Sequence, residues 1–203
     1  MTERTETMKK IINLTALLLT ACLTAPAAFA DDPFGFDITE SPAKYDYCSV
    51  MEVDKDVYAC TDAPKPHPAF ELYLPSHDDG LGVLKVRAIG KTLKNDSYGH
   101  QARAEIERIK DQLTAKYGEP TSHYGGSYSH DPQDWLLKIY QNEWVYDYYW
   151  FQHIGYKQVG NVYAIGLKVR AVNYSDSRIH LDFEYPNLEK YIERKRARES
   201  DAF

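Results

Sequence analysis

The clearest structural signal in the chain is the sequence IGLKVRAVNYSDSRIHLDFEY, residues 165–185. Apolar side chains alternate with charged ones on both sides of a polar turn at residues 173–177. This period of two predicts an antiparallel hairpin with one buried face. If both apolar sets face a core, Lys168 and Arg170 lie on the Asp182 side, where opposite charges stabilise a cross-strand pair by a few tenths of a kcal/mol to about 1 kcal/mol.

The remaining elements fit around this hairpin. Alternating side chains predict strands at residues 69–74 and 81–93, and a helix is expected over residues 98–117 with Ser97 as its N-cap and Gly118 just past its end. The apolar positions of this helix recur at spacings of three and four: Ala102, Ile106, Ile109, Leu113 and Tyr117. Shorter helices are expected after Pro132 and after Pro186. The order predicts an α+β fold, an antiparallel sheet with the long helix (about 98–117) and the shorter helices packed on one face.

The first thirty residues predict export. Lys9 and Lys10 precede an apolar run at residues 11–21, and Ala28-Phe29-Ala30 supplies small residues at the cleavage positions. Acidic residues before Met8 are unusual in such a leader, so Met8 is an alternative start. The sequence therefore predicts a signal peptide at residues 1–30, a single α+β domain at residues 31–203 and a periplasmic location.

A second interpretation of the leader stays open. Residues 19–22 end in Cys22 after small side chains, as in a bacterial lipoprotein signal. Lipidation of Cys22 would make the chain an outer-membrane lipoprotein with a structural role. The apolar run is too short to span a bilayer comfortably, so no membrane span is expected.

Cys48 and Cys60 are the two cysteines that follow the leader. In an oxidising compartment they predict one disulfide, which stabilises a loop of this length by about 3 kcal/mol on the chain-entropy model. A metal site is the weaker alternative, because no histidine lies nearby.

The charge of the chain is mildly acidic, with a formal net charge of −6. No basic patch interleaved with aromatic residues is present, so nucleic acid is not an expected partner. The basic side chains near the C-terminus predict a solvated helix end, with contact to anionic lipid or wall polymer as the alternative; they are Arg194, Lys195, Arg196 and Arg198.

Aromatic residues give the strongest functional signal, since eight of them crowd into residues 135–151. If residues 144–151 form a strand, Trp144, Tyr146, Tyr148 and Trp150 share one side, and Val145, Asp147, Tyr149 and Phe151 share the other, wetter side. About half of these rings are expected in the core. Exposed tyrosine and tryptophan suit a protein interface or a sugar-stacking surface. The predicted binding residues are Tyr124, Tyr128, Tyr149 and Trp150, the predicted partner is an envelope protein or cell-wall glycan, and the chain is expected to be a monomer or weak oligomer.

Catalytic and metal-binding signals are weaker. The seven histidines are scattered, and both His-acid clusters, at residues 77–79 and 130–131, are expected to be solvated turns. No metal or cofactor is predicted. Ser127 and Ser129 lie near His123 and His130, which leaves a small periplasmic hydrolase as the alternative function, although neighbours in sequence are weak evidence for a catalytic set. The sequence favours a non-catalytic binding module, with an inhibitor or immunity protein as one possible type.

Several short strings also occur together in a suggestive order. They are Pro66-His67-Pro68-x-Phe70-Glu71-x-Tyr73, Gly80-Leu81, Ala88-Ile89-Gly90-Lys91, Lys116-Tyr117-Gly118, Asp134-Trp135, Trp150 and Glu184-Tyr185-x-Asn187. In this order the chain resembles a family of small exported proteins of Gram-negative bacteria that has no assigned activity. The resemblance implies export and a single domain, and it assigns no functional residues.

Overall fold

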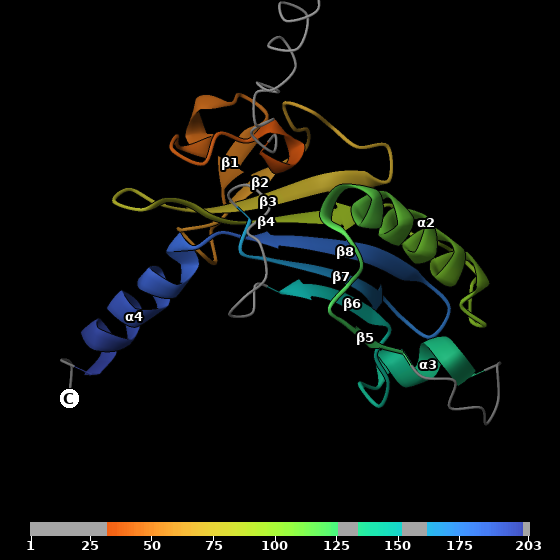
Figure 1. Cartoon of the computed structure of the whole chain (residues 1–203). Coiled ribbons are helices and arrows are strands. Elements are labelled where there is room, and N and C mark those ends of the chain that lie inside the picture. The colour runs from red at the N-terminus through yellow and green to blue at the C-terminus, as the bar shows by residue number, and fades with distance from the viewer. Residues whose placement is uncertain (1–31, 126–133, 152–161, 201–203) are drawn as a thin grey trace, which may run out of the picture. The chain divides into compact units, whose positions relative to one another are not determined.

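One antiparallel sheet organises the described part of the chain, residues 32–125, 134–151 and 162–200. In the computed structural model its eight strands follow the order β1-β2-β3-β4-β8-β7-β6-β5 (Figure 1). The strands are β1 (Cys48–Val50), β2 (Tyr58–Cys60), β3 (Phe70–Asp78), β4 (Gly82–Gly90), β5 (Ser122–Tyr124), β6 (Asp147–Phe151), β7 (Ala164–Ala171) and β8 (Ser177–Glu184). The predicted α+β fold is confirmed.

The predicted C-terminal hairpin lies at the centre of this sheet. Leu167 of β7 pairs with Leu181 of β8, and Ile165 pairs with Phe183. All four side chains are buried, so the alternation read from the sequence marks the core face of the sheet. β8 also pairs with β4, and this pairing joins the two halves of the chain.

Helix α2 (His100–Tyr117) packs on the core face against β7 and β8. Its start is set by Asp96 and not by the predicted cap Ser97. The Asp96 carboxylate accepts hydrogen bonds from the backbone N–H of Gln101 at 3.0 Å and of Ala102 at 2.8 Å. These bonds satisfy donors that the first turn leaves without partners, so the helix begins two residues later than expected. The predicted apolar face is confirmed at its buried positions Ala102, Ile106, Ile109 and Leu113.

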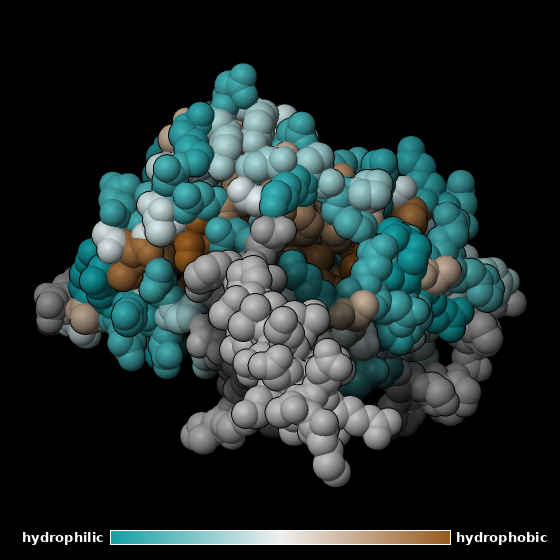
Figure 2. Space-filling view, turned by 45° about the horizontal axis from the view of Figure 1, so that its top comes forward, coloured by the Kyte–Doolittle hydropathy of each residue, from teal (hydrophilic) through white to brown (hydrophobic). Residues whose placement is uncertain are grey.

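Two further segments complete the layer over the core face. Helix α3 (Trp135–Tyr140) buries Trp135 in the same apolar cluster. The N-terminal segment contains the short helices η1 (Pro33–Gly35) and η2 (Pro42–Lys44), and its Phe34 ring lies 5.7 Å from that of Phe183. In the view of Figure 2, hydrophilic side chains cover most of the described surface and hydrophobic ones show mainly in recesses.

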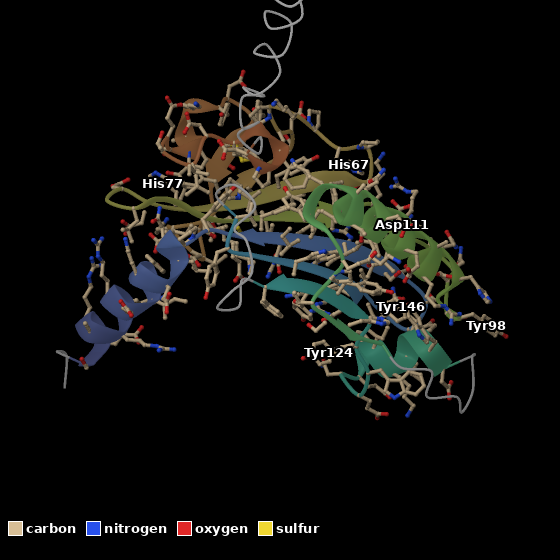
Figure 3. All side chains as sticks on the ribbon, in the orientation of Figure 1. His67, His77, Tyr98, Asp111, Tyr124 and Tyr146 are labelled. Atoms are coloured by element: carbon tan, nitrogen blue, oxygen red, sulfur yellow. A yellow bond between two sulfur atoms is a disulfide. The ribbon has the colours of Figure 1, made fainter. Side chains whose placement is uncertain are left out.

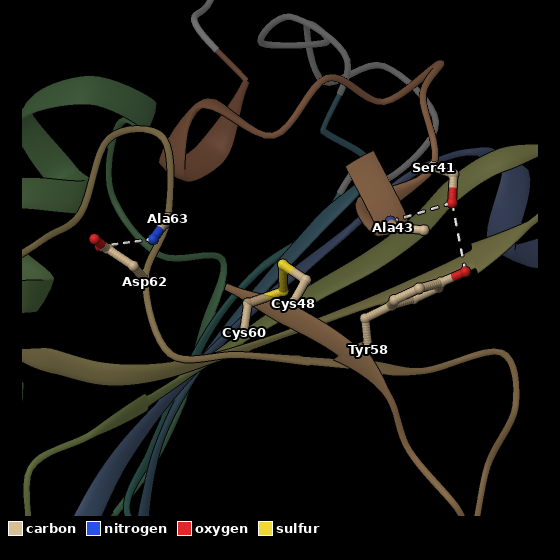
Figure 4. The surroundings of a disulfide bond; sticks show 7 residues. All are labelled: Ser41, Ala43, Cys48, Tyr58, Cys60, Asp62 and Ala63. Atoms are coloured by element: carbon tan, nitrogen blue, oxygen red, sulfur yellow. Dashed lines mark hydrogen bonds between the residues drawn. A yellow bond between two sulfur atoms is a disulfide. The ribbon is translucent and has the colours of Figure 1, made fainter. Parts of the chain in front are cut away.

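The predicted disulfide is present and joins β1 to β2 (Figure 4). Cys48 and Cys60 are directly opposite each other in the strand register, and Cys60 is fully buried. The same hairpin is held to η2 by a 3.4 Å hydrogen bond between the hydroxyls of Ser41 and Tyr58. The bridge therefore fixes a short strand pair at one edge of the sheet.

The last helix, α4 (Asn187–Ser200), follows β8 and contacts β4, and none of its side chains is buried. Its Tyr191 hydroxyl donates a hydrogen bond to the Asp56 carboxylate in the loop between β1 and β2. Within the described residues, no helix is long and apolar enough to cross a membrane.

Candidate functional site

The sheet face opposite α2 carries charged and aromatic side chains, and we call it the polar face. Its central group is Asp182 of β8, whose side chain is only 2% exposed. Arg87 Nε of β4 lies 2.6 Å from one Asp182 oxygen, and Lys168 Nζ of β7 lies 3.2 Å from the other. Lys168 thus lies on the Asp182 side of the hairpin, as the sequence predicted, and it reaches the Asp182 carboxylate from the neighbouring strand. The carboxylate joins three neighbouring strands through charge-assisted hydrogen bonds.

The surroundings of Asp182 keep it ionised. Burial acts to raise its pKa, but the hydrogen bond from Arg87 and the charges of Lys85 and Lys168 outweigh burial and lower the pKa to about 2. At neutral pH the group is therefore a fixed anion within a ring of cations. Such a group braces the sheet and is poorly suited to transferring protons.

A second buried carboxylate, Asp147 of β6, organises the neighbouring part of the polar face. The guanidinium of Arg170 lies 3.3 Å from one of its oxygens, and the Tyr149 hydroxyl donates a 2.9 Å hydrogen bond to the other. Arg170 thus pairs with Asp147 of the adjacent strand. Burial, reinforced by the hydrogen bond to Asp147, raises the pKa of Tyr149 to about 12. The Tyr149 ring is therefore neutral and held in one orientation.

Three rings form an aromatic platform beside these charges; we define it as Tyr124, Tyr149 and Phe151. The Tyr149 and Phe151 rings stack with centroids 5.3 Å apart and planes 8° apart, and the Tyr124 ring meets Tyr149 edge-on at 5.7 Å. Lys168 Nζ lies 5.3 Å from the Tyr149 centroid. Tyr124 is 55% exposed at the edge strand β5 (Figure 3). The platform thus combines flat apolar rings with a neighbouring ammonium group.

The structure separates the predicted binding residues. Tyr124 and Tyr149 lie together on the platform, whereas Trp150 points to the core face, is 6% exposed and donates its indole N–H to the Gly118 carbonyl at 2.8 Å. Tyr128 lies outside the described residues, as does Cys22. Trp150 therefore does not share the surface on which Tyr149 lies.

The alternation that the sequence predicted for residues 144–151 accounts for this separation. Tyr148 and Trp150 face the core, and Tyr149 and Phe151 face the other side. Sequence reasoning missed Lys168 and Arg170 as neighbours of the platform. Their alternation in β7 is visible in the sequence, but the pairing of β6 with β7 is not.

A further polar cluster lies on the core side, where α2 meets β6. The Tyr146 and Tyr148 hydroxyls both donate to one carboxylate oxygen of Glu107, Tyr146 at 3.0 Å, and Lys110 Nζ lies 2.9 Å from the other oxygen. The His123 ring stacks on Tyr148 with centroids 4.1 Å apart. A carboxylate, two phenols and an imidazole could in principle serve acid–base chemistry.

The electrostatics of this cluster argue for a structural role. Burial acts to raise the pKa of Glu107, but hydrogen bonds from Tyr148, Lys110 and Tyr146 lower it overall. The pKa of Tyr148 is raised by burial and by its hydrogen bond to Glu107. Both groups keep one protonation state around neutral pH, whereas an acid–base catalyst needs a pKa near the working pH. The cluster therefore fastens α2 to β6.

Neither a catalytic Ser/His set nor a metal-ligand set is found among the described residues. Ser127, Ser129 and His130 lie outside them, so their geometry with His123 is not described. Within residues 32–125, 134–151 and 162–200, no three His, Cys, Asp or Glu side chains are placed to hold a metal ion.

In comparisons with known proteins, no family model, no curated protein and no solved structure matches the chain. The resemblance to small exported proteins of Gram-negative bacteria therefore stays a prediction.

Proposed function

We propose that the chain is an exported, non-catalytic binding module of the bacterial envelope, and that it engages an envelope protein or a wall glycan through the aromatic platform. The observation that carries this proposal is the stacked pair Tyr149 and Phe151, with exposed Tyr124 beside it and Lys168 over the Tyr149 ring. The rings give flat apolar area, and the charged neighbours give hydrogen-bonding groups that orient a ligand.

Preorganisation is the physical reason why this surface suits binding. The Tyr149 side chain is fixed through its hydroxyl by Asp147, and Asp147 is fixed by Arg170. A ring that is already held in place loses little rotamer entropy when a ligand covers it. The residues that contribute most of the binding energy in protein interfaces are enriched in tryptophan, tyrosine and arginine.

The proposed location rests on two supports. The leader pattern at residues 1–30 is typical of secreted proteins. The Cys48–Cys60 bridge agrees with an oxidising compartment, where disulfides persist. We propose the periplasm, with lipidation at Cys22 as the alternative route to the envelope.

The test is capture from envelope extract with immobilised, oxidised protein. Wild type is compared with Tyr149→Ala, which removes the central ring of the platform, and with Tyr174→Ala as the matched control. Tyr174 is 68% exposed in the turn between β7 and β8, so its loss removes an exposed tyrosine elsewhere. Each variant is first checked for a native circular dichroism spectrum and unfolding transition.

The proposal predicts one ligand that wild type and Tyr174→Ala retain and that Tyr149→Ala loses. Digestion of the retained fraction with protease or with wall-lytic enzyme then identifies the ligand as protein or glycan. Equal retention by all three proteins, or no retained ligand, would count against the platform as the binding surface.

A further inference from the structure

A second candidate binding site lies at the far side of the sheet from the platform. A hollow of about 440 Å³ opens between α4 and the end of the β3–β4 hairpin, and we call it the α4 cleft. In the sheet order, β4, β8 and β7 lie between β3 and the platform strand β6. Figure 3 labels His77 of this region and Tyr124 of the platform region at well-separated places. The site is therefore independent of the proposed function.

The charges that line the α4 cleft come from three segments of the chain. The β3–β4 hairpin contributes the carboxylates of Asp78 and Asp79, and α4 contributes Arg194 and Arg198. The loop between β1 and β2 adds one charge of each sign, Lys55 and Asp56. Arg194 Nη1 lies 3.9 Å from Asp78 Oδ1, an ion pair that is longer than a hydrogen bond. Arg198 forms no ion pair with any residue that the structure describes. Carboxylates and cations thus line the same cleft, and the cleft stays open between them.

A tether holds the helix at this separation. The Tyr191 hydroxyl of α4 donates to the Asp56 carboxylate, and this hydrogen bond, with burial, raises the pKa of Tyr191 to about 12. The Asp78 carboxylate is itself oriented, since it accepts the Gly80 backbone N–H at 2.9 Å. These bonds leave acidic groups on the sheet end and basic groups on the helix with free hydrogen-bonding capacity.

His77 is a further polar side chain of the α4 cleft. The sequence predicted a solvated turn here, but the His77 side chain is only 8% exposed and lines the α4 cleft. Its Nδ1 lies 3.7 Å from a carboxylate oxygen of the fully exposed Asp79, which is within ion-pair range but longer than a hydrogen bond. Among the described residues, the His77 ring nitrogens do not belong to the buried side-chain atoms that lack a hydrogen-bond partner, so they can be reached from the cleft. A ligand in the cleft can therefore offer the ring a hydrogen bond.

We propose that the α4 cleft binds a small zwitterion of the class of free amino acids and short peptides. Its ammonium group lies on Asp78 and Asp79, its carboxylate lies on Arg194 and Arg198, and a polar atom of the ligand reaches the ring of His77. Two charge-assisted interactions of opposite sign recognise the two ends together, and a ligand that lacks either charge leaves one set of protein charges uncompensated.

Calorimetric titration of the full exported chain tests this proposal. The probes are glycine, lysine and glycylglycine, and the blocked probes are N-acetylglycylglycine, which lacks the ammonium group, and glycylglycinamide, which lacks the carboxylate. At least one of the three free zwitterions binds, and the two blocked dipeptides bind about tenfold more weakly than glycylglycine or worse, since each lost charge-assisted hydrogen bond is worth about 1.4 kcal/mol or more. Absence of binding by all three zwitterions at millimolar concentration would overturn the proposal.

Variants and a spectroscopic readout locate the binding. Arg194→Gln with Arg198→Gln weakens binding about tenfold or more, whereas Arg196→Gln, the same change on the same helix outside the α4 cleft, leaves it unchanged. In NMR spectra the ring signals of His77 shift on titration, and those of His67 do not. Binding that survives the double variant, or that leaves the His77 ring signals unmoved, contradicts the assignment. Tyr149→Ala leaves binding unchanged, which separates this result from that of the platform.

Discussion

Removal of the buried charge on the polar face should weaken the fold measurably. The change is Asp182→Asn, which keeps the shape of the side chain and removes its anion. Arg87, Lys85 and Lys168 then surround a neutral amide, and their mutual repulsion is no longer offset. The free energy of unfolding is expected to fall because breaking a buried ion pair leaves uncompensated charge.

The pKa of Asp182 gives the magnitude. A folded-state pKa of about 2 against the usual 3.8 corresponds to about 2 kcal/mol of stabilisation. Because the folded pKa is the lower one, this stabilisation is complete above the unfolded pKa and is lost as the pH falls towards about 2. Removal of one partner of a buried pair costs about 3–5 kcal/mol, and Arg87 is 39% exposed, so we expect about 2–3 kcal/mol near neutral pH.

Urea unfolding of wild type and Asp182→Asn measures this difference. The gap between them should be about 2–3 kcal/mol near pH 6 and should shrink by about 1 kcal/mol near pH 3, because there the unfolded wild-type chain binds a proton at Asp182 that the folded protein still largely excludes. Glu184→Gln is the control, since Glu184 pairs with Lys85 at the more exposed end of the same strand and should cost about 0.5 kcal/mol or less. Equal stability of Asp182→Asn and wild type, or a gap that widens in acid, would refute the reasoning.

Three further outcomes follow from individual contacts. Burial, with the charge of Arg87, lowers the pKa of His180 to about 4. An NMR titration of its ring should therefore give a midpoint near that value, and the free energy of unfolding should decrease as the pH falls from about 6.5 towards 4. An ordinary histidine midpoint would contradict the burial. Gly99→Ala should cost about 2 kcal/mol or more in thermal unfolding, because φ is +69° there and an added Cβ would lie 1.9 Å from a ring carbon of Trp135; a neutral effect would contradict this packing. Cys48→Ser with Cys60→Ser should lower stability under oxidising conditions by about 3 kcal/mol and should remove the difference between oxidised and reduced protein.

The sequence predicts the elements that depend on local periodicity. The alternation at residues 165–185 can be recognised because only one face of each strand is buried. The pairs Leu167–Leu181 and Ile165–Phe183 confirm the predicted hairpin. The same argument assigned Tyr149 and Trp150 to opposite sides of β6. It could not say which side faces a helix, and for that reason Trp150 was expected to bind a ligand.

Contacts between segments that are distant in the chain cannot be predicted from local periodicity. Asp182 and Arg87 are 95 residues apart in the chain and meet only because β8 returns to pair with β4. His77 was expected in a solvated turn, since local polarity cannot show that α4, more than a hundred residues later, lies beside it. The predicted start of α2 was wrong for a related reason. A loop brings Asp96, and not Ser97, to the first N–H groups of the helix.

The most direct test of the central claim is hydrogen–deuterium exchange of the full exported chain with and without the ligand captured from the envelope. Binding through the aromatic platform predicts new protection in β5 and β6, around Tyr124, Tyr149 and Phe151, with unchanged exchange in the turn that holds Tyr174. Protection confined to other segments, with β5 and β6 unchanged, would contradict the platform as the binding surface.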